Sequence, residues 1–83
     1  FPPASPSAPY RVQFGAFRRV ASADELSAML DGAGIPTTVY LAPGTGMNVV
    51  VTDAGFRTAE EAQRWIDYEG GRRGWTERPL VIR

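Results

Sequence analysis

The chain contains two similar segments, and this near-repeat limits the possible folds more than any other feature. GAFRRVASADEL (15–26) and AGFRTAEEA (54–62) share a strand end, a Gly or Ala, a Phe, an Arg and then a helix start. The two copies lie roughly 36 to 39 residues apart, a spacing typical of repeated supersecondary units. We therefore expect two pseudo-symmetric βαβ halves packed together.

Four segments have the apolar alternation or the β-branched composition of strands. They are YRVQFGAF (10–17), IPTTVYL (35–41), MNVVVT (47–52) and PLVI (79–82). The turn residues of APGTG (42–46) predict a hairpin-type loop between the second and third strands.

Two segments between the strands are predicted to be helices. In SADELSAMLDGAG (22–34), Ser22 and Glu25 form a capping box and Gly34 is a left-handed stop. In the second helix Thr58 and Glu61 repeat the capping box, and Gly70 and Gly71 are predicted to end it. The predicted buried stripes are Leu26, Met29, Leu30 and Ala33 in the first helix and Ala62, Trp65 and Ile66 in the second.

The order β-α-β-β-α-β predicts an α+β fold, a ferredoxin-like two-layer sandwich. It has a four-stranded antiparallel sheet with two helices on one face. A chain of 83 residues has room for one such core. We place the domain at residues 10–83, after a Pro-rich linker at 1–9.

Helices on one side leave the other face of the sheet open, and strand alternation predicts which side chains lie there. Val12, Phe14 and Ala16 are expected to face the helices, so that Arg11, Gln13 and Phe17 lie on the open face. Thr38, Tyr40 and Val81 are also expected there, with Leu80 and Ile82 turned inward. The third strand is apolar on both faces; if Val50 faces the helices, then Met47, Val49 and Val51 lie outside.

Composition excludes several kinds of chemistry. With no Cys and no His, the chain has no thiol nucleophile, no imidazole base and no Cys/His zinc site. The acidic pairs Asp24–Glu25 and Glu60–Glu61 sit in predicted first turns, where negative charge stabilises a helix. We expect no catalytic residue, no metal and no cofactor.

The charge balance and hydropathy exclude two kinds of partner. Nine basic and nine acidic residues give a formal net charge of zero, which argues against nucleic acid. No apolar run approaches the length that inserts into a membrane. A surface of amide, guanidinium, tyrosine and small aliphatic groups instead suits a polysaccharide, because flat apolar groups pack on sugar C–H faces and amides bond hydroxyl groups.

VQFGAF (12–17) resembles the opening strand of the SPOR domain family. The helix SADELSAMLDGAGI, the valine-rich third strand, GFRTAEEA and the last strand also fall where that family has them, over Tyr10 to Ile82. The resemblance implies a βαββαβ module that binds peptidoglycan glycan strands without stem peptides and marks bacterial division sites.

The resemblance also implies which residues contact the glycan. The family's glutamine is Gln13, where it would bond N-acetyl groups, and its small polar position is Ala16. Other implied positions are Met47 or Asn48, then Val49 or Val50, and Val81. Arg11 is expected to meet the lactyl carboxylate of muramic acid, and Tyr40 is a further candidate.

Three departures from the family pattern weaken the expected binding. Ala16 has no hydroxyl, the third strand lacks its arginine, and DAGF (53–56) replaces the usual G-P-F with one extra residue. We expect the extra residue to form a bulge at Asp53.

We therefore expect a non-catalytic, monomeric domain at the end of a longer protein, located in the periplasm of a bacterial envelope, with the division septum as the narrower location. The alternative is a βαββαβ regulatory module that dimerises and senses a small molecule. An RNA-binding module of this topology is a weaker alternative, because NVVVT carries no aromatic side chains for base stacking.

Overall fold

The computed structural model describes residues 8–83, so most of the predicted linker, residues 1–9, lies outside the described residues. The elements are β1 Arg11–Phe17, α1 Val20–Gly32, β2 Thr37–Leu41, β3 Asn48–Thr52, α2 Ala59–Arg73 and β4 Leu80–Ile82. The predicted βαββαβ order and the α+β fold class are confirmed.

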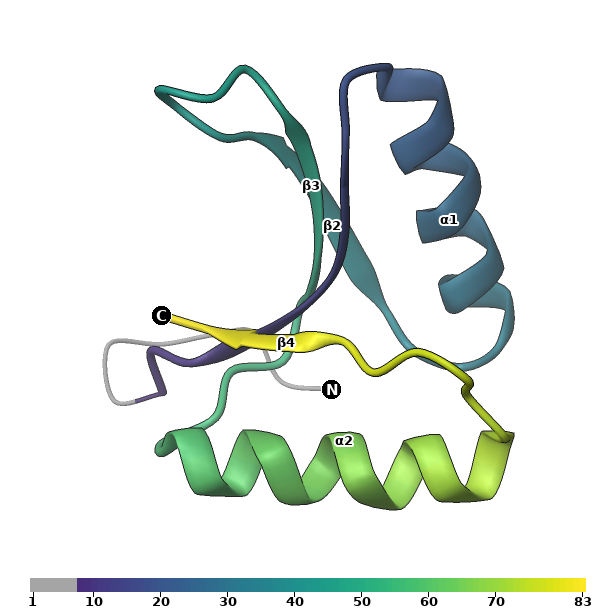
Figure 1. Ribbon diagram of the computed structural model, residues 1–83, viewed down its shortest axis with the longest axis vertical. Helices are drawn as coiled ribbons and strands as arrows, with labels where there is room; N and C mark the ends of the chain where they lie inside the picture. Colours follow the sequence, from purple (N-terminus) through teal and green to yellow (C-terminus); the bar gives the residue numbers. More distant parts are fainter. Residues whose placement is uncertain (1–7) are drawn as a thin grey trace.

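The strands form one antiparallel sheet in the order β2-β3-β1-β4, with the first and third strands at its centre. Helix α1 packs against β1, β2 and β3, while α2 packs against β1 and β4. Figure 1 shows the two helices running crosswise, α1 beside the upper part of the sheet and α2 beneath β4. Each helix thus covers its own part of the sheet.

The core consists of two clusters that share two aromatic side chains, Phe14 and Trp65. The cluster under α1 contains the buried residues Ala23, Leu30, Ile35 and Val50, and the cluster under α2 contains Val12, Ala62 and Ile66. Phe14 packs against both clusters. Its ring meets Trp65 and Trp75 edge-on, with centroids 6.2 and 5.5 Å away. Trp75 therefore closes one end of the core, as a lid would.

Helix α1 begins two residues earlier than predicted. Its N-cap is Arg19, which makes no side-chain capping bond, so the capping box of Ser22 and Glu25 is wrong. Ala23, in the first turns of the helix, packs against the sheet and is fully buried. Met29, predicted to be buried, is 71% exposed. The predicted stop at Gly34 is confirmed by its φ of 90°.

Helix α2 begins as predicted and ends later. The Thr58 hydroxyl accepts a hydrogen bond from the Glu61 N–H at 3.1 Å, which confirms the cap. The helix runs through Gly70 and Gly71 to Arg73 and stops at Gly74, with φ 72°. The Arg78 guanidinium lies against Gly70, so a Cβ added there would displace the end of this exposed side chain.

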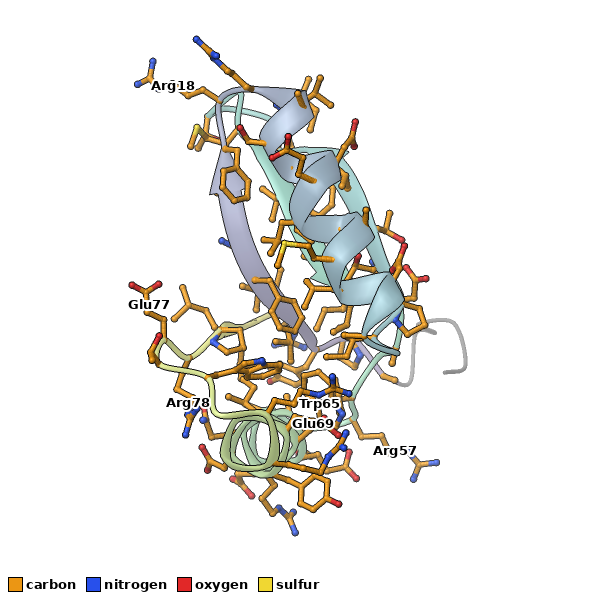
Figure 2. The ribbon with its side chains drawn as sticks, turned by 90° about the vertical axis from the view of Figure 1, so that its right-hand side faces the viewer. Arg18, Arg57, Trp65, Glu69, Glu77 and Arg78 are labelled. Carbon is orange, nitrogen blue, oxygen red and sulfur yellow. The ribbon has the colours of Figure 1, made fainter. Side chains whose placement is uncertain are left out.

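An arginine joins the C-terminal ends of the two helices. Arg73 donates to the Glu69 carboxylate at 2.6 Å and to the Ala33 carbonyl, at the end of α1, at 2.9 Å. Figure 2, which views α2 end-on, shows Glu69 on the side of α2 nearest that end of α1. The hydrogen bond from Arg73 is the main cause that lowers the pKa of Glu69. The carboxylate therefore remains charged, and the pair intact, across the neutral range.

A bulge bends β1 near its middle. Gln13 pairs with Val51, but the next pair along β3 is Gly15 with Val50, so β1 carries one extra residue. A bulged strand bends and twists more strongly, and Figure 1 shows β1 turning from the direction of β4 into that of β3. On the β2 side the chain stays regular at Asp53, whose N–H donates to the Pro36 carbonyl. Against β1 the predicted irregularity is present, because two residues between Tyr10 and Gln13 lie opposite four residues between Val51 and Phe56.

One buried hydroxyl completes the hydrogen bonding where the β1–β3 ladder ends. Thr52 is 1% exposed. Its hydroxyl accepts from the Val12 N–H at 3.2 Å and donates to the Ala54 carbonyl at 3.0 Å. Because a buried backbone N–H without a partner costs free energy, Thr52 stabilises β1 beside the bulge.

Candidate binding surface on the open face of the sheet

The bulge decides which side chains of β1 lie on the open face, meaning the face away from both helices. Val12 and Phe14 pack under the helices, as predicted. Gln13 shares a face with its partner Val51, and Ala16 shares one with Val49. The extra residue thus returns Ala16 to the same side as Gln13, although plain alternation predicted the opposite side.

The same shift turns Phe17 inward. It was predicted to lie on the open face, but it packs against the cluster under α1. Gly15 also faces the helices, since its partner is the core residue Val50. A Cβ on Gly15 would lie 2.9 Å from the Phe17 ring and 3.3 Å from Leu26. Gly15, two residues after Gln13, is therefore required by packing on the helix side of the sheet.

Gln13 occupies the centre of the open face. It is the residue of β1 that pairs with both neighbours, Val51 on β3 and Leu80 on β4. The side chain is half-buried, and within residues 8–83 its amide makes no hydrogen bond. The amide is thus held at the bend of the sheet with its donors and its acceptor available to a ligand.

Two valines of β3 form the apolar base of the open face, called here the floor. Val50 faces the helices and belongs to the cluster under α1, which excludes it as a contact on the open face. Val49 and Val51 face the other way, opposite Tyr40 and Thr38 of β2. They are nevertheless only 5% and 0% exposed. A ligand would touch the groups around this floor more than the floor itself.

Two predicted site residues lie elsewhere. Val81 was predicted to face outward, but it is opposite Val12 and packs against the cluster under α2. Asn48 is opposite Phe17, and its amide donates to the carbonyls of Phe17 at 3.3 Å and Arg18 at 3.2 Å. Val81 therefore lies on the helix side of the sheet, and Asn48 binds the backbone at the end of β1.

The other predicted positions are brought together. Arg11, Gln13 and Ala16 lie on the open face of β1, with Tyr40 and Val49 on the neighbouring strands. Met47 precedes β3, and its carbonyl accepts from the Ala42 N–H, which extends the hairpin by one pair. Alternation then places Met47 on the same side as Val49, at the margin of the surface.

Leu80 and Ile82 were missed as surface residues. They are opposite Gln13 and Arg11, and so they flank these polar groups on the open face. Leu80 is 63% exposed. The size of their side chains suggested that both were core residues. Only the register between β1 and β4, which nothing in a three-residue strand specifies, assigns them to the outside.

The open face can therefore offer an amide, a guanidinium and a phenol, spread around aliphatic groups. Ala16 and Tyr40 are exposed, while Arg11 and Gln13 are half-buried. No group of three Asp or Glu side chains that could hold a metal ion occurs among residues 8–83. No helix within the same range has the length and hydropathy to cross a membrane. This chemistry suits a neutral or weakly anionic ligand rich in hydroxyl and amide groups.

The sequence was compared with protein families and with known proteins. The model of the SPOR domain family matches residues 6–67, which includes everything from β1 to the middle of α2. No curated protein and no solved structure matches the chain.

Proposed function

The chain belongs to the SPOR domain family, which is known for binding peptidoglycan, and on that basis we propose that its ligand is the glycan strand stripped of stem peptides. In this proposal the domain is a non-catalytic module that brings a larger protein to the cell envelope. The observation that carries the proposal is the position of Gln13, whose amide lies at the centre of the open face without a partner among residues 8–83.

The proposed pose follows the polar groups along the sheet. Gln13 bonds the N-acetyl groups, for which its amide offers both donors and an acceptor. Arg11 is two positions away on the same face, and its guanidinium pairs with the lactyl carboxylate that muramic acid exposes once the stem peptide is gone. Tyr40, 39% exposed, packs its ring on the C–H face of a sugar.

The preference for denuded glycan has a physical reason in this pose. A stem peptide is attached through the lactyl carboxylate, so its presence removes the charge that Arg11 would meet. The stem peptide would also be a bulky chain that has to fit against the curved open face of the sheet. We therefore propose that the domain works in the periplasm, where the cell wall lies, and is enriched at the division septum, where amidases cut stem peptides from the glycan.

Replacing Gln13 by alanine should weaken glycan binding by about 10-fold or more, because hydrogen bonds to the N-acetyl groups are lost. The measurement is the bound fraction of the domain in pull-downs with purified sacculi, before and after digestion with an amidase. Amidase treatment should increase the binding of the wild type and have little effect on the variant.

The matched control is Gln63→Ala. Gln63 is exposed on α2, where its amide donates to Asp67, remote from the open face. Neither variant should change the free energy of unfolding by more than about 0.5 kcal/mol. Equal binding of the Gln13 and Gln63 variants, or equal binding to amidase-treated sacculi and to a matrix without glycan, would contradict the proposal.

Replacing Ala16 by serine should strengthen binding. The position is exposed on the open face, and the new hydroxyl adds one hydrogen bond worth about 0.5 to 1.5 kcal/mol. Affinity should rise roughly 2- to 13-fold, measured by titrating defined denuded glycan fragments against both proteins. Ala28→Ser, an equally small change on the exposed side of α1, serves as the control. Unchanged affinity for the Ala16 variant would place the glycan away from this part of β1.

The missing arginine of the third strand cannot be restored in the same way. Val49 faces the open side but is 5% exposed, and Val50 lies in the core. A guanidinium at either position would be buried without a partner, which is costly. Serine at Ala16 is therefore the informative change, and we expect the wild-type domain to bind weakly.

A further inference from the structure

The outer edge of β2 carries backbone groups that no part of the described chain uses. β2 is the edge strand next to β3 and contains only uncharged residues, TTVYL. The hydrogen bonds at its two ends show which residues face β3. The Pro36 carbonyl accepts from Asp53, and the Ala42 N–H donates to Met47. In an antiparallel ladder these groups alternate, so Thr38 and Tyr40 also face β3.

The remaining residues of β2 direct their N–H and carbonyl groups away from the sheet. The Thr37 N–H is taken by the Asp31 carboxylate at 2.8 Å, which confirms its outward direction. Val39 and Leu41 have the same orientation, and no side chain or loop within residues 8–83 meets their outward groups. Proteins usually protect such an edge with charge, proline or a covering segment. Here the Asp31 carboxylate occupies the outward N–H of Thr37, while the outward groups of Val39 and Leu41 have no partner within residues 8–83.

We propose that a second copy of this chain docks on this edge, β2 against β2, with the two-fold axis at Tyr40. Val39 of one copy then pairs with Leu41 of the second copy, and each such pair exchanges both of its hydrogen bonds. The sheet continues from one copy into the next. A two-fold axis makes the interface self-complementary, which is the commonest arrangement of dimers.

The register is fixed by which groups are free. An axis one residue earlier, at Val39, would pair Leu41 with Thr37, whose N–H is already bound to Asp31. An axis at Leu41 would pair Val39 with Pro43, which has no N–H. The axis at Tyr40 is the one that uses the outward groups of Val39 and Leu41 and requires no others.

The side chains support the same register. Leu41 is 64% exposed although it lies on the helix side of the sheet, and the pairing would cover it with Val39 of the second copy. The two Tyr40 rings would meet across the axis on the open face, as aromatic pairs do between strands. With no charge in β2 and a formal net charge of zero, the copies do not repel each other.

The proposed pairing joins two strands of five residues, a contact below the standard interface size. We therefore expect the domain to be monomeric when dilute and to dimerise only at high protein concentration. A monomer, as the sequence predicts, is the state we expect in dilute solution. Tyr40 belongs both to this edge and to the proposed glycan surface, but the experiment uses the domain without glycan, so its outcome does not depend on the proposed glycan binding.

The test uses the absence of cysteine from the chain. In Tyr40→Cys the two thiols face each other across the axis at a separation that allows a disulfide. In Thr38→Cys, on the same strand and the same face, the two thiols are about 13 Å apart along the paired strands, too far for a bond. Under mild oxidation at high protein concentration we expect Tyr40→Cys to crosslink at least 10-fold faster.

A second pair of variants tests the same edge without thiols. Leu41→Lys puts a charge inside the proposed interface, and Leu80→Lys puts one at an equally exposed leucine on the opposite edge. Sedimentation equilibrium should show loss of dimers for the first variant only. Equal crosslinking rates for the two cysteine variants, or dimers that survive Leu41→Lys, would overturn the proposal. Association through β2 with an unrelated peptide but not with itself would also do so.

Discussion

Replacing Phe14 by alanine should cost about 3 to 5 kcal/mol of the free energy of unfolding, a large share of what a small domain possesses. The ring packs on both core clusters and meets two tryptophans edge-on. Its loss leaves a cavity where the parts of the sheet under α1 and under α2 join. Urea denaturation followed by tryptophan fluorescence measures the effect, because Trp65 and Trp75 surround the site.

Gln13→Ala is the matched control, since it changes the neighbouring residue on the other face of the same strand. It should shift the unfolding midpoint only slightly. If the two variants lost equal stability, the faces of β1 would be assigned the wrong way round. If the Phe14 variant were as stable as the wild type, Trp65, which also packs against both clusters, would be enough to join them.

Replacing Gly15 by alanine should cost about 1 to 3 kcal/mol, and Gly15→Val should cost more. The reason is overpacking, because the new Cβ would lie 2.9 Å from Cε2 and 3.0 Å from Cζ of Phe17. The backbone itself is not the cause, since Gly15 is not among the glycines with positive φ. Thermal melts of the variants give the size of the effect.

A double-mutant cycle identifies the contact. Phe17→Leu removes the Cε2 and Cζ atoms that the new Cβ would meet, so the cost of Gly15→Ala should fall in that background, although the contact with Leu26 at 3.3 Å remains. Gly71→Ala is the control, because nothing lies within 4 Å of a Cβ there. If Gly15→Ala cost just as much in the Phe17→Leu background, the Phe17 ring would not be what requires the glycine, and the Leu26 contact or the bulge would be the cause.

Local signals in the sequence predicted those elements that local interactions determine. Thr58 caps α2 because its hydroxyl reaches an N–H three residues away, a distance that the sequence itself specifies. The start of α1 was missed because its N-cap, Arg19, makes no side-chain capping bond and so leaves no local signal in the sequence.

The sequence predicted the face on which the central residue of the candidate surface lies, but it misplaced several residues around it. Gln13 was assigned to the correct face because the larger groups Val12 and Phe14 mark the buried face of β1. Ala16 and Phe17 exchanged faces because a bulge adds one residue, and a single residue reverses alternation. Val81 was misplaced because the β4 register is set by pairing with a strand some 70 positions earlier in the chain.

That pairing of β4 with β1 also determines how the domain would respond to mechanical force. Arg11 is directly opposite Ile82, so the chain enters and leaves the domain at adjacent points. A pull on the two flanks acts across the β1–β4 hydrogen bonds, and these open one pair after another instead of sharing the load. The paired part of β1 and β4 is short and ends at Gln13 and Leu80. Force applied to both ends of the domain would therefore separate β4 from β1 first, and β4 is the strand that lies beside Gln13.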